Sequence, residues 1–471
     1  TLHPPCTTIQ IFPQWGLDKM ITHLKIENFK SWRAADISLG SLTGLFGPNS
    51  SGKTSILQFL LMLKQTVESP DRKLVMHLGN ERTWVELGSW KDLIFAHNPE
   101  NKLHFQIDWN SPEPLTIQDP LSLNENISTS NLRFKATLQG DESGELKTQN
   151  FSYELDDFVF GMNKRDDAWE LNKENFELKM TKGRKWDLPA PIKFYGFPEI
   201  INSYYQNAGF LSDLQLAFEN LSSRIYYLGP LRDFPKRQYT WTGGSPGDMG
   251  FRGEKFVDAI LAAKKEGSLI SKGKGRKRVT LEERVAEWLK ELGLINSFKV
   301  EKISGSESLY QVLVRKNSTS PEVTLADVGF GVSQILPVIA LCYYAPEKSI
   351  LLIEQPEIHL HPSVQAGLAD VFMDTIKHRN VQIILESHSE YLLRRLQRRI
   401  AENNYSAERA KLYFCDIQQQ QSELTPLSIN SFGQIENWPD GFFADDFREI
   451  TAMNKAILER QIENTNGGQR N

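Results

Sequence analysis

Cysteine is scarce in this 471-residue sequence, and its three cysteines, Cys6, Cys342 and Cys415, form no C-x-x-C pair. This scarcity excludes a disulfide-rich scaffold and favours a reducing compartment such as the cytoplasm. Long apolar runs are also missing, because the longest one, residues 335–345, is too short to cross a bilayer. No signal-peptide pattern is visible, and we therefore expect a cytoplasmic protein without membrane contact.

The sequence has no strong excess of charge of either sign and no internal repeat. Its formal net charge of -5 argues against a protein coated by nucleic acid, although a local basic patch is compatible with that value. There is no run of heptads, so long coiled-coil arms are not expected. With 40% hydrophobic and 24% charged residues, the composition is that of a globular protein, and the length suffices for two or three lobes.

One motif in the N-terminal part has a specific chemical meaning. Residues 47–54 read GPNSSGKT and fit the pattern G-x-x-x-x-G-K-[ST]. They follow a strand-like apolar segment (42–46) and precede a segment with helical spacing (55–69). In such a loop the main-chain N–H groups face phosphates, the lysine contacts the β- and γ-phosphates, and the threonine is a magnesium ligand. The sequence therefore predicts a nucleotide site with Lys53 and Thr54 in these roles.

A second strand-like apolar segment, residues 349–353, is followed by Glu354 and Gln355. Glu354 stands where an acidic residue would hold magnesium through water. A second carboxylate usually comes next and accepts a proton from the attacking water. Gln355 is an amide and cannot accept that proton, so the sequence leaves the general base open.

Two further segments gain meaning from their order along the chain. Residues 328–334, VGFGVSQ, place two glycines and a serine before a helix, where they could bind a second phosphate group. Residues 386–389, ESHS, end another strand-like segment, and His388 could sense a γ-phosphate there. Alone, the first would be an ordinary turn and the second an ordinary histidine.

Together, over residues 20–400, these motifs resemble the ABC-type ATPase head of SMC, RecF and overcoming-lysogenization-defect (OLD) proteins. The order matches: phosphate loop, signature, acidic strand and switch histidine. A narrower resemblance is to stand-alone bacterial ATPases that are often encoded near phage-defence genes and carry a C-terminal domain of unknown function. It is carried by YLGPLR, MGFRGE, VGFGVSQ, IEQPEIHLHP, ESHSEYLL and the tail IENWPDGFFADDFREI (435–450).

The resemblance implies ATP and Mg²⁺ as cofactors and assigns roles by position. Thr54 and Glu354 would support the metal, and His388 would be the switch histidine. In the segment that replaces the family's LSGG-type signature, the serine is displaced from its usual second place. The nucleotide-binding residues implied are Gly47, Pro48, Asn49, Ser50, Ser51, Gly52, Lys53, Thr54, Ser55, Gly329, Gly331, Ser333 and Gln334.

Gln355 departs from the acid of ABC heads in general, although the narrower group also carries glutamine there. Losing a general base costs about 10²–10⁴ in rate. Three explanations are open: hydrolysis is slow so that an ATP-bound dimer lasts, Glu357 is the base, or His388 helps to orient water. We rank slow hydrolysis first, because it needs no unusual geometry, and Glu357 second.

The expected fold is α/β: an ABC-type P-loop ATPase head with an antiparallel β lobe and a mixed, RecA-like α/β lobe. Alternating segments within residues 75–195 favour the antiparallel lobe. Thr280 and Glu283 predict a capping box at the start of a helix over 279–294. The expected divisions are an extension (1–19), the N-terminal part of the head (20–95), a β-rich lobe (96–207), a helical and basic-loop region (208–300), the C-terminal part of the head (301–425) and a tail segment (426–471).

Two basic clusters leave the class of partner open. They are Lys272, Lys274, Arg276, Lys277 and Arg278 in one loop, and Arg394, Arg395, Arg398 and Arg399 on one helix. Nucleic acid fits, since lysine and arginine release counterions from phosphate. A solvated face or a dock for an acidic partner also fits, and few aromatic residues lie between the charges to stack on bases.

The leading interpretation is an ABC-type ATPase that dimerises head to head around ATP, hydrolyses it slowly and gates a separate effector in anti-phage defence. No Asp-x-Asp motif follows His388, so we expect any nuclease to be a separate chain. The alternatives are a RecF- or SMC-like DNA-binding repair ATPase and a non-enzymatic scaffold that binds ATP. Salt-dependent DNA affinity would favour the former, and assembly without phosphate release the latter.

Overall fold

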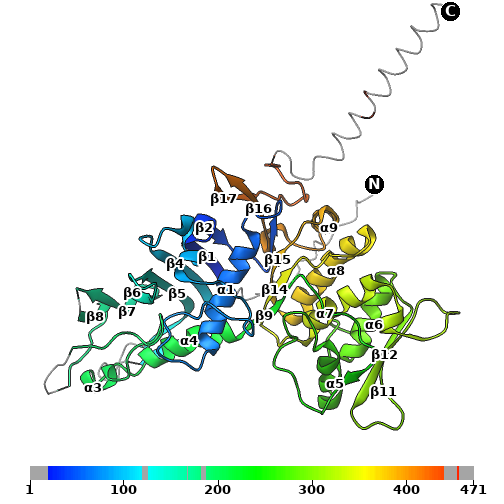
Figure 1. Cartoon of the computed structure of the whole chain (residues 1–471), viewed down its shortest axis with the longest axis horizontal. Helices are drawn as coiled ribbons and strands as arrows, with labels where there is room; N and C mark the ends of the chain where they lie inside the picture. The colour runs from blue at the N-terminus through cyan, green and yellow to red at the C-terminus, as the bar shows by residue number, and fades with distance from the viewer. Residues whose placement is uncertain are drawn as a thin grey trace, which may run out of the picture.

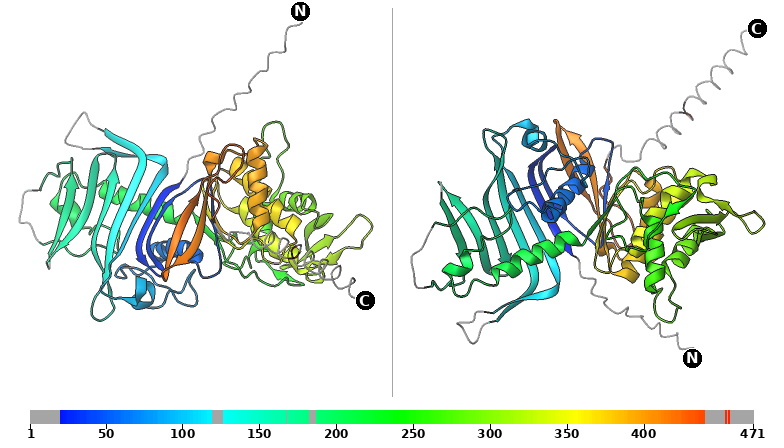
Figure 2. Two further views of the ribbon diagram at one scale, coloured as in Figure 1. Left: turned by 90° about the horizontal axis from the view of Figure 1, so that it is seen from above. Right: turned by 60° about the horizontal axis from the view of Figure 1, so that its bottom comes forward.

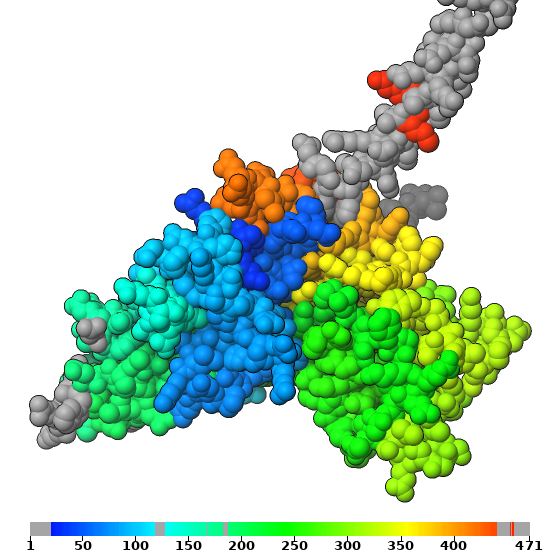
Figure 3. Space-filling view, in the orientation of Figure 1, coloured from blue at the N-terminus to red at the C-terminus, as the bar shows by residue number. Residues whose placement is uncertain are grey.

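The computed structural model describes residues 20–118, 126–166, 168–181 and 187–439, with residues 453 and 455. The predicted extension 1–19 and residues 440–450 of the tail motif lie outside the described residues. Figure 1 shows two lobes side by side, a β-rich lobe in blue to green and a helical lobe in green to yellow. The space-filling view in Figure 3 shows the same lobes in contact in the upper part of the view and apart from each other below.

One lobe is built on a seven-stranded antiparallel sheet in the order β2-β1-β4-β5-β6-β7-β8. Its strands are β1 (Ile21–Phe29), β2 (Trp32–Ser38), β4 (Leu103–Gln118), β5 (Asn126–Gly140), β6 (Leu146–Leu155), β7 (Phe158–Arg165) and β8 (Ala168–Glu174). Because β1 pairs directly with β4, the predicted division between residues 95 and 96 falls within one sheet.

Helices cover one face of this sheet, as Figure 2 shows. Apolar side chains from both sides form a single core, which includes Phe59 of the first long helix, Phe218 of the second and Phe134 of β5. Aromatic rings dominate this core, and the ring centroids of Phe134 and Phe218 lie 4.7 Å apart. The helical elements of the lobe are α1 (Lys53–Glu68), α2 (Trp90–Leu93), α3 (Ile201–Tyr204), α4 (Leu211–Ser223) and a 3₁₀ turn at Phe95–His97.

A six-stranded mixed sheet forms the wall between the lobes, in the order β17-β16-β3-β15-β14-β9. Its strands are β3 (Leu42–Phe46), β9 (Ile225–Leu228), β14 (Ile350–Glu354), β15 (Gln382–Glu386), β16 (Ala410–Gln418) and β17 (Gln421–Leu427). Successive side chains of a strand face opposite sides. Accordingly, Leu352 and Ile384 belong to the core of the β-rich lobe, while Leu351 and Ile383 belong to that of the helical lobe.

The helical lobe packs five helices and a small sheet around the second core. The elements are α5 (Phe256–Glu266), α6 (Leu281–Glu291), α7 (Phe330–Tyr344), α8 (Pro362–Arg379), α9 (Glu390–Ala401), β10 (Tyr239–Thr240), β11 (Ser297–Lys302), β12 (Leu309–Arg315), β13 (Val323–Thr324) and 3₁₀ turns at Leu325–Asp327 and Ala407–Arg409.

The predicted capping box is confirmed, since Thr280 and Glu283 bond reciprocally at the start of α6. The predicted α/β fold with an antiparallel and a mixed lobe is also confirmed. Within the described ranges, no helix is long and apolar enough to cross a membrane.

A buried glutamine joins the two large sheets. The side-chain carbonyl of Gln382, at the start of β15, accepts a hydrogen bond from the Ile21 N–H at 2.9 Å. The side-chain amide donates to the carbonyl oxygens of Ile21 at 2.7 Å and Gly40 at 2.9 Å. Buried main-chain groups need partners, so this side chain fixes where the antiparallel sheet meets the middle of the mixed sheet.

Replacing Gln382 with leucine should therefore destabilise the fold at the joint between the sheets. The variant removes three hydrogen bonds to buried main-chain groups, and we expect the free energy of unfolding to fall by about 2–4 kcal/mol. Urea denaturation measures this change. Gln418→Leu, at an exposed position of β16, is the control and should change stability by less than about 0.5 kcal/mol. Equal stability of the two variants would contradict the assigned joint.

Candidate phosphate and metal site

The loop between β3 and α1 has a backbone that only glycine accommodates at two points. Gly47 has φ 139° and Gly52 has φ 89°. A Cβ at Gly47 would lie 2.0 Å from the carbonyl oxygen of Cys415, and one at Gly52 would lie 2.4 Å from the Ser422 hydroxyl. The loop is thus held against β16 and β17, and its N–H groups lead into the N-terminus of α1, which favours anions.

Lys53 folds back over this loop. Its ammonium donates to the carbonyl oxygens of Gly47 at 3.1 Å and Pro48 at 2.6 Å. Desolvation lowers the pKa of Lys53, and the charge of Glu386 opposes that shift. A buried ammonium held mainly by neutral carbonyl groups is incompletely compensated, and a phosphate placed in the loop would supply the missing negative charge.

Thr54, the predicted magnesium ligand, contacts a carboxylate from another strand. Its hydroxyl donates to Glu386, the last residue of β15, at 2.6 Å. The other carboxylate oxygen of Glu386 accepts from the Gln355 side-chain amide at 3.4 Å, and the Gln355 N–H donates to the Glu386 carbonyl at 2.8 Å. Because β15 lies between β3 and β14, the ends of these three parallel strands converge on one point.

Glu354, at the end of β14, faces the same region but has different partners. Its carboxylate accepts a hydrogen bond from the Tyr227 hydroxyl at 2.8 Å, and its carbonyl accepts one from the Arg232 guanidinium at 3.0 Å. Desolvation, followed by the charge of Glu386, raises the pKa of Glu354 to about 7. This carboxylate is therefore poised to gain from a nearby cation.

Glu357 and His388 are also brought together. One carboxylate oxygen of Glu357 accepts from the His388 main-chain N–H at 2.5 Å. Burial raises the pKa of the Glu357 carboxyl. The pKa of His388 is lowered, first by desolvation and then by the charge of Lys53. Glu357, the residue considered as an alternative base, thus holds the turn that carries the predicted switch histidine.

Several buried polar atoms around this point lack a partner within the described residues: Oε2 of Glu357, Nε2 of His388, and Nε and Nη1 of Arg232. Unpaired buried groups cost free energy unless a ligand or water engages them.

The hydroxyl of Thr54 and the carboxylates of Glu354 and Glu386 are oxygen donors of the kind that suits Mg²⁺. In the described ranges no group of three or more His, Cys, Asp or Glu could hold a metal alone, so remaining ligands would come from phosphates and water. The site thus fits Mg²⁺ with ATP.

The four signature residues lie elsewhere, at the start of α7. The expectation that the segment 328–334 precedes a helix is wrong for three of them, because α7 already begins at Phe330 and contains Gly331, Ser333 and Gln334. Gly329 is the N-cap of this helix, and a Cβ at Gly331 would lie 3.1 Å from the carbonyl oxygen of His359. Ser333 is buried and donates to the carbonyl of Phe330 at 2.7 Å, while the Nε2 of buried Gln334 has no partner among the described residues. No hydrogen bond of the described structure joins these residues to the phosphate loop of the same chain, and their nucleotide role stays a prediction.

The basic clusters have more opposing carboxylates than the local sequence suggests. On α9, Arg395 and Arg399 pair with Asp370, while Arg394 pairs with Glu390 and Arg398 with Glu402. In the loop, Lys272 pairs with Glu287. Within the described ranges, the clustered side chains that are exposed and have no ion pair are Lys274, Arg276, Lys277 and Arg278.

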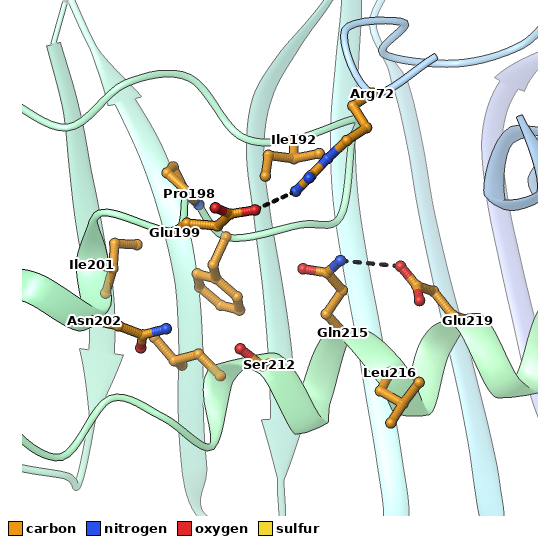
Figure 4. A pocket seen from close by; sticks show the side chains of 12 residues that line it. Arg72, Ile192, Pro198, Glu199, Ile201, Asn202, Ser212, Gln215, Leu216 and Glu219 are labelled. Carbon is orange, nitrogen blue, oxygen red and sulfur yellow. Dashed lines mark hydrogen bonds and ion pairs between the residues drawn. The ribbon is translucent and has the colours of Figure 1, made fainter. Parts of the chain in front are cut away.

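Two hollows elsewhere on the surface are separate from this site. One, of about 320 Å³, lies between residues 192–202 and α4, and no residue of the phosphate loop lines it (Figure 4). Its charged groups are engaged: Arg72 pairs with Glu199 at 2.7 Å, and Glu219 accepts from the Gln215 amide at 3.0 Å. The other, of about 450 Å³, lies over strands of the antiparallel sheet.

Sequence reasoning assigned no role to Glu386, Tyr227 or Arg232. Tyr227 and Arg232 belong to YLGPLR and Glu386 to ESHSEYLL, which the resemblance to stand-alone ATPases had already singled out. The available signal was thus the recurrence of these segments, because no local spacing links Tyr227 on β9 and Arg232 in the following loop to Glu386 on β15.

The raised pKa of Glu354 gives a testable pH dependence. A carboxyl that holds its proton more tightly when folded stabilises the protein below its unfolded pKa, and that contribution is lost as the pH rises from 4.5 to about 7. The glutamine of Glu354→Gln does not titrate, so the variant does not lose this stability as the pH rises. We therefore expect the melting temperature of the variant minus that of the parent to increase from pH 5 to pH 8. A difference independent of pH would contradict the assignment.

Comparison with solved structures finds SMC head domains at low identity. One, an SMC head bound to the C-winged helix domain of ScpA, is 12% identical with a TM-score of 0.45, covering 87% of this chain and 98% of that chain. An SMC head domain from Thermotoga maritima is 11% identical with a TM-score of 0.41, covering 87% and 100%. One from Pyrococcus furiosus, with an extended coiled coil and bound to the C-terminal domain of ScpA, is 11% identical with a TM-score of 0.42, covering 87% and 96%. No curated protein matches the chain.

Two family models match the sequence. The first is described as a protein of unknown function (DUF3696) and matches residues 406–452, which confirms the predicted C-terminal domain of unknown function. The second matches residues 42–394, a span that includes the phosphate loop, the signature segment, Glu354 and Glu386. The predicted relationship to ABC- and AAA-type ATPases is thereby confirmed, and the chain belongs to the family described as "AAA domain, putative AbiEii toxin, Type IV TA system".

Proposed function

We propose that this chain binds Mg²⁺ and ATP at residues 47–55, closes into a head-to-head dimer around two nucleotides, hydrolyses ATP slowly and so gates a separate effector in bacterial anti-phage defence. The observation that carries the proposal is the phosphate loop, in which Lys53 is buried and Thr54 contacts a carboxylate at the end of β15. A bound Mg²⁺ would polarise the phosphoryl oxygens. Thr54 and Glu354 would support it, and Lys53 would contact the phosphates.

Slow hydrolysis is supported by the amide at position 355 and by the contacts of Glu357, the residue considered as an alternative base. The Gln355 side chain is an amide, and its NH₂ group points at Glu386. Glu357 has one oxygen engaged with the His388 N–H. A site without a general base loses about 10²–10⁴ in rate, or roughly 3–5 kcal/mol of barrier, which would let an ATP-bound state persist.

An exposed apolar cluster next to the signature supports the closed dimer. Its centre is the pair Phe234 and Phe330, which are 73% and 37% exposed. Leu231 and Phe251, 69% and 41% exposed, lie on two neighbouring loops that are joined by the hydrogen bond from the Gly229 N–H to the Phe251 carbonyl. The ring centroids of Phe234 and Phe330 lie 5.7 Å apart, and those of Phe330 and His359 lie 5.0 Å apart. Contiguous apolar side chains at a surface are typical of interaction sites, and Phe330 lies within the predicted signature. We infer that a second copy covers this cluster when ATP binds.

The gated effector is supported by the family description, which names a toxin of a type IV toxin–antitoxin system, and by the resemblance to ATPases encoded near defence genes. A DNA-binding repair ATPase is the second candidate, favoured by the exposed run of Lys274, Arg276, Lys277 and Arg278. A linear dependence of DNA affinity on the logarithm of salt concentration would support that candidate.

Removing the lysine of the phosphate loop should abolish ATP binding. In Lys53→Ala the phosphates lose the attraction of a buried positive charge. The carbonyl oxygens of Gly47 and Pro48, which Lys53 engages, would then be left near the negatively charged phosphates without a donor between them. Isothermal titration calorimetry with Mg²⁺ and ATP, beside a melting curve, tests this. Lys91→Ala, at an exposed position, should bind as the parent does. Parent-like ATP affinity in Lys53→Ala would refute the site.

The dimer makes a separate prediction about Phe234. In Phe234→Ser an apolar side chain is lost from the exposed cluster, so the ATP-dependent dimer should weaken while ATP affinity of the monomer stays unchanged. Light scattering with Mg²⁺ and ATP measures the dimer. Phe432→Ser is a matched control, because Phe432 is 74% exposed but lies outside the cluster. Equal dimerisation of both variants would exclude the cluster as the interface.

A further inference from the structure

Glu386 has an environment that ordinary surface or capping roles do not explain. It is only 2% exposed, and its two carboxylate oxygens have separate partners. One accepts from the Thr54 hydroxyl at 2.6 Å and the other from the Gln355 amide at 3.4 Å. Thr54 and Gln355 are both residues to which the sequence gave a place in the nucleotide site.

We propose that Glu386 is the carboxylate that positions Thr54 for magnesium, and that Gln355 serves to hold Glu386 in place. This inference rests on the proposed function, since it presumes that Mg²⁺ and ATP bind at this loop. It adds a residue from the middle strand β15 to the metal site. It also gives the amide at position 355 a purpose other than the mere absence of a base.

The first part of the proposal follows from the number of hydrogen bonds and metal contacts that a threonine hydroxyl can make. The group has one proton and two lone pairs, and a metal takes a lone pair. The proton must then go to an acceptor that leaves the lone pair facing the metal. A charged acceptor also makes the hydroxyl oxygen a better ligand, as second-shell carboxylates do for metal-bound histidines. In the described structure Glu386 is the acceptor of the Thr54 proton.

The second part follows from the contact between Glu386 and Gln355. An amide nitrogen donates to the carboxylate oxygen that Thr54 leaves unused. A glutamate at position 355 would instead have no amide hydrogen to donate and would bring a second carboxylate against Glu386, so an attractive contact would be replaced by a repulsive one. The main-chain bond from the Gln355 N–H to the Glu386 carbonyl, at 2.8 Å, keeps the two side chains in register.

Glu354 is left with a distinct place in the same site. Its carboxylate is oriented by the Tyr227 hydroxyl from the far side, at 2.8 Å, and it is bonded to neither Thr54 nor Gln355 in the described structure. Two carboxylates would therefore serve the metal from two adjacent strands, Glu354 from β14 and Glu386 from β15.

The test is the magnesium dependence of ATP binding by the full-length chain. ATP affinity is measured by calorimetry with EDTA and across a Mg²⁺ titration. In Glu386→Met, metal-free affinity should match the parent, while the Mg²⁺ concentration for half-maximal enhancement should rise by about 10–100-fold, the usual cost of removing a second-shell partner. Glu386→Gln, which keeps an acceptor for Thr54 but no charge, should fall between Glu386→Met and the parent. Glu347→Gln, at an exposed surface pair, should behave as the parent.

Gln355→Glu provides an independent arm if the Glu386 variants fold poorly. The proposal expects this variant to need more Mg²⁺ and to release phosphate no faster than the parent. If Gln355 only marks a missing base, the variant should instead keep the parent's Mg²⁺ response and release phosphate at least about tenfold faster. That result, or an unchanged Mg²⁺ response in well-folded Glu386→Met, would overturn the proposal.

Failure of the proposed function would look different. If the parent chain itself binds no ATP, the nucleotide site is refuted and none of the variants matters. If the parent binds ATP with a Mg²⁺-dependent gain that Glu386→Met retains, the nucleotide site stands and only the assignment of Glu386 is lost.

Discussion

The position of one five-residue strand, β15, determines how the molecule is assembled and where its chemistry lies. At its start, Gln382 bonds to the main chain of Ile21 and Gly40 and fixes the antiparallel sheet. At its end, Glu386 receives the hydroxyl of Thr54 from the phosphate loop. Both contacts exist because β15 is inserted between β3 and β14 in the mixed sheet. The joint between the two large sheets and the candidate metal site thus lie at opposite ends of the same strand.

The charges gathered at the end of this strand indicate what kind of ligand the site accepts. Glu354, Glu357 and Glu386 are buried, and the buried cations nearest to them are Lys53 and Arg232. Desolvation lowers the pKa of both cations and raises the pKa of Glu354 and Glu357. A phosphate alone would repel the carboxylates, and a metal alone would leave Lys53 uncompensated. A metal paired with phosphates satisfies both sets of charges, which is why Mg²⁺ with ATP fits better than either component.

Much of this could be predicted from the sequence where the signal is local. The phosphate loop, the acidic strand end and the capping box at Thr280 all depend on residues a few positions apart, and the alternating strands reveal the antiparallel lobe. The role of Glu386 could not be predicted, because its contact with Thr54 depends on strand order, which no local spacing encodes. The same limit applies to the arginines of α9. They read as a basic patch in the sequence, yet Asp370, which neutralises two of them, comes from α8.

The loop after β9 connects the surface cluster to the candidate metal site. Leu231 and Phe234 are exposed, while Arg232 between them is buried and donates to the carbonyl oxygen of Glu354. The loop is braced by a second one, since the Gly229 N–H donates to the carbonyl of Phe251 at 2.8 Å. Because the guanidinium is held by the end of β14, a partner that displaced Leu231 or Phe234 would pull on the main chain of Glu354. The Arg232 side chain is therefore one physical link between the exposed apolar surface and the carboxylates, and among the described residues its Nε and Nη1 have no hydrogen-bond partner.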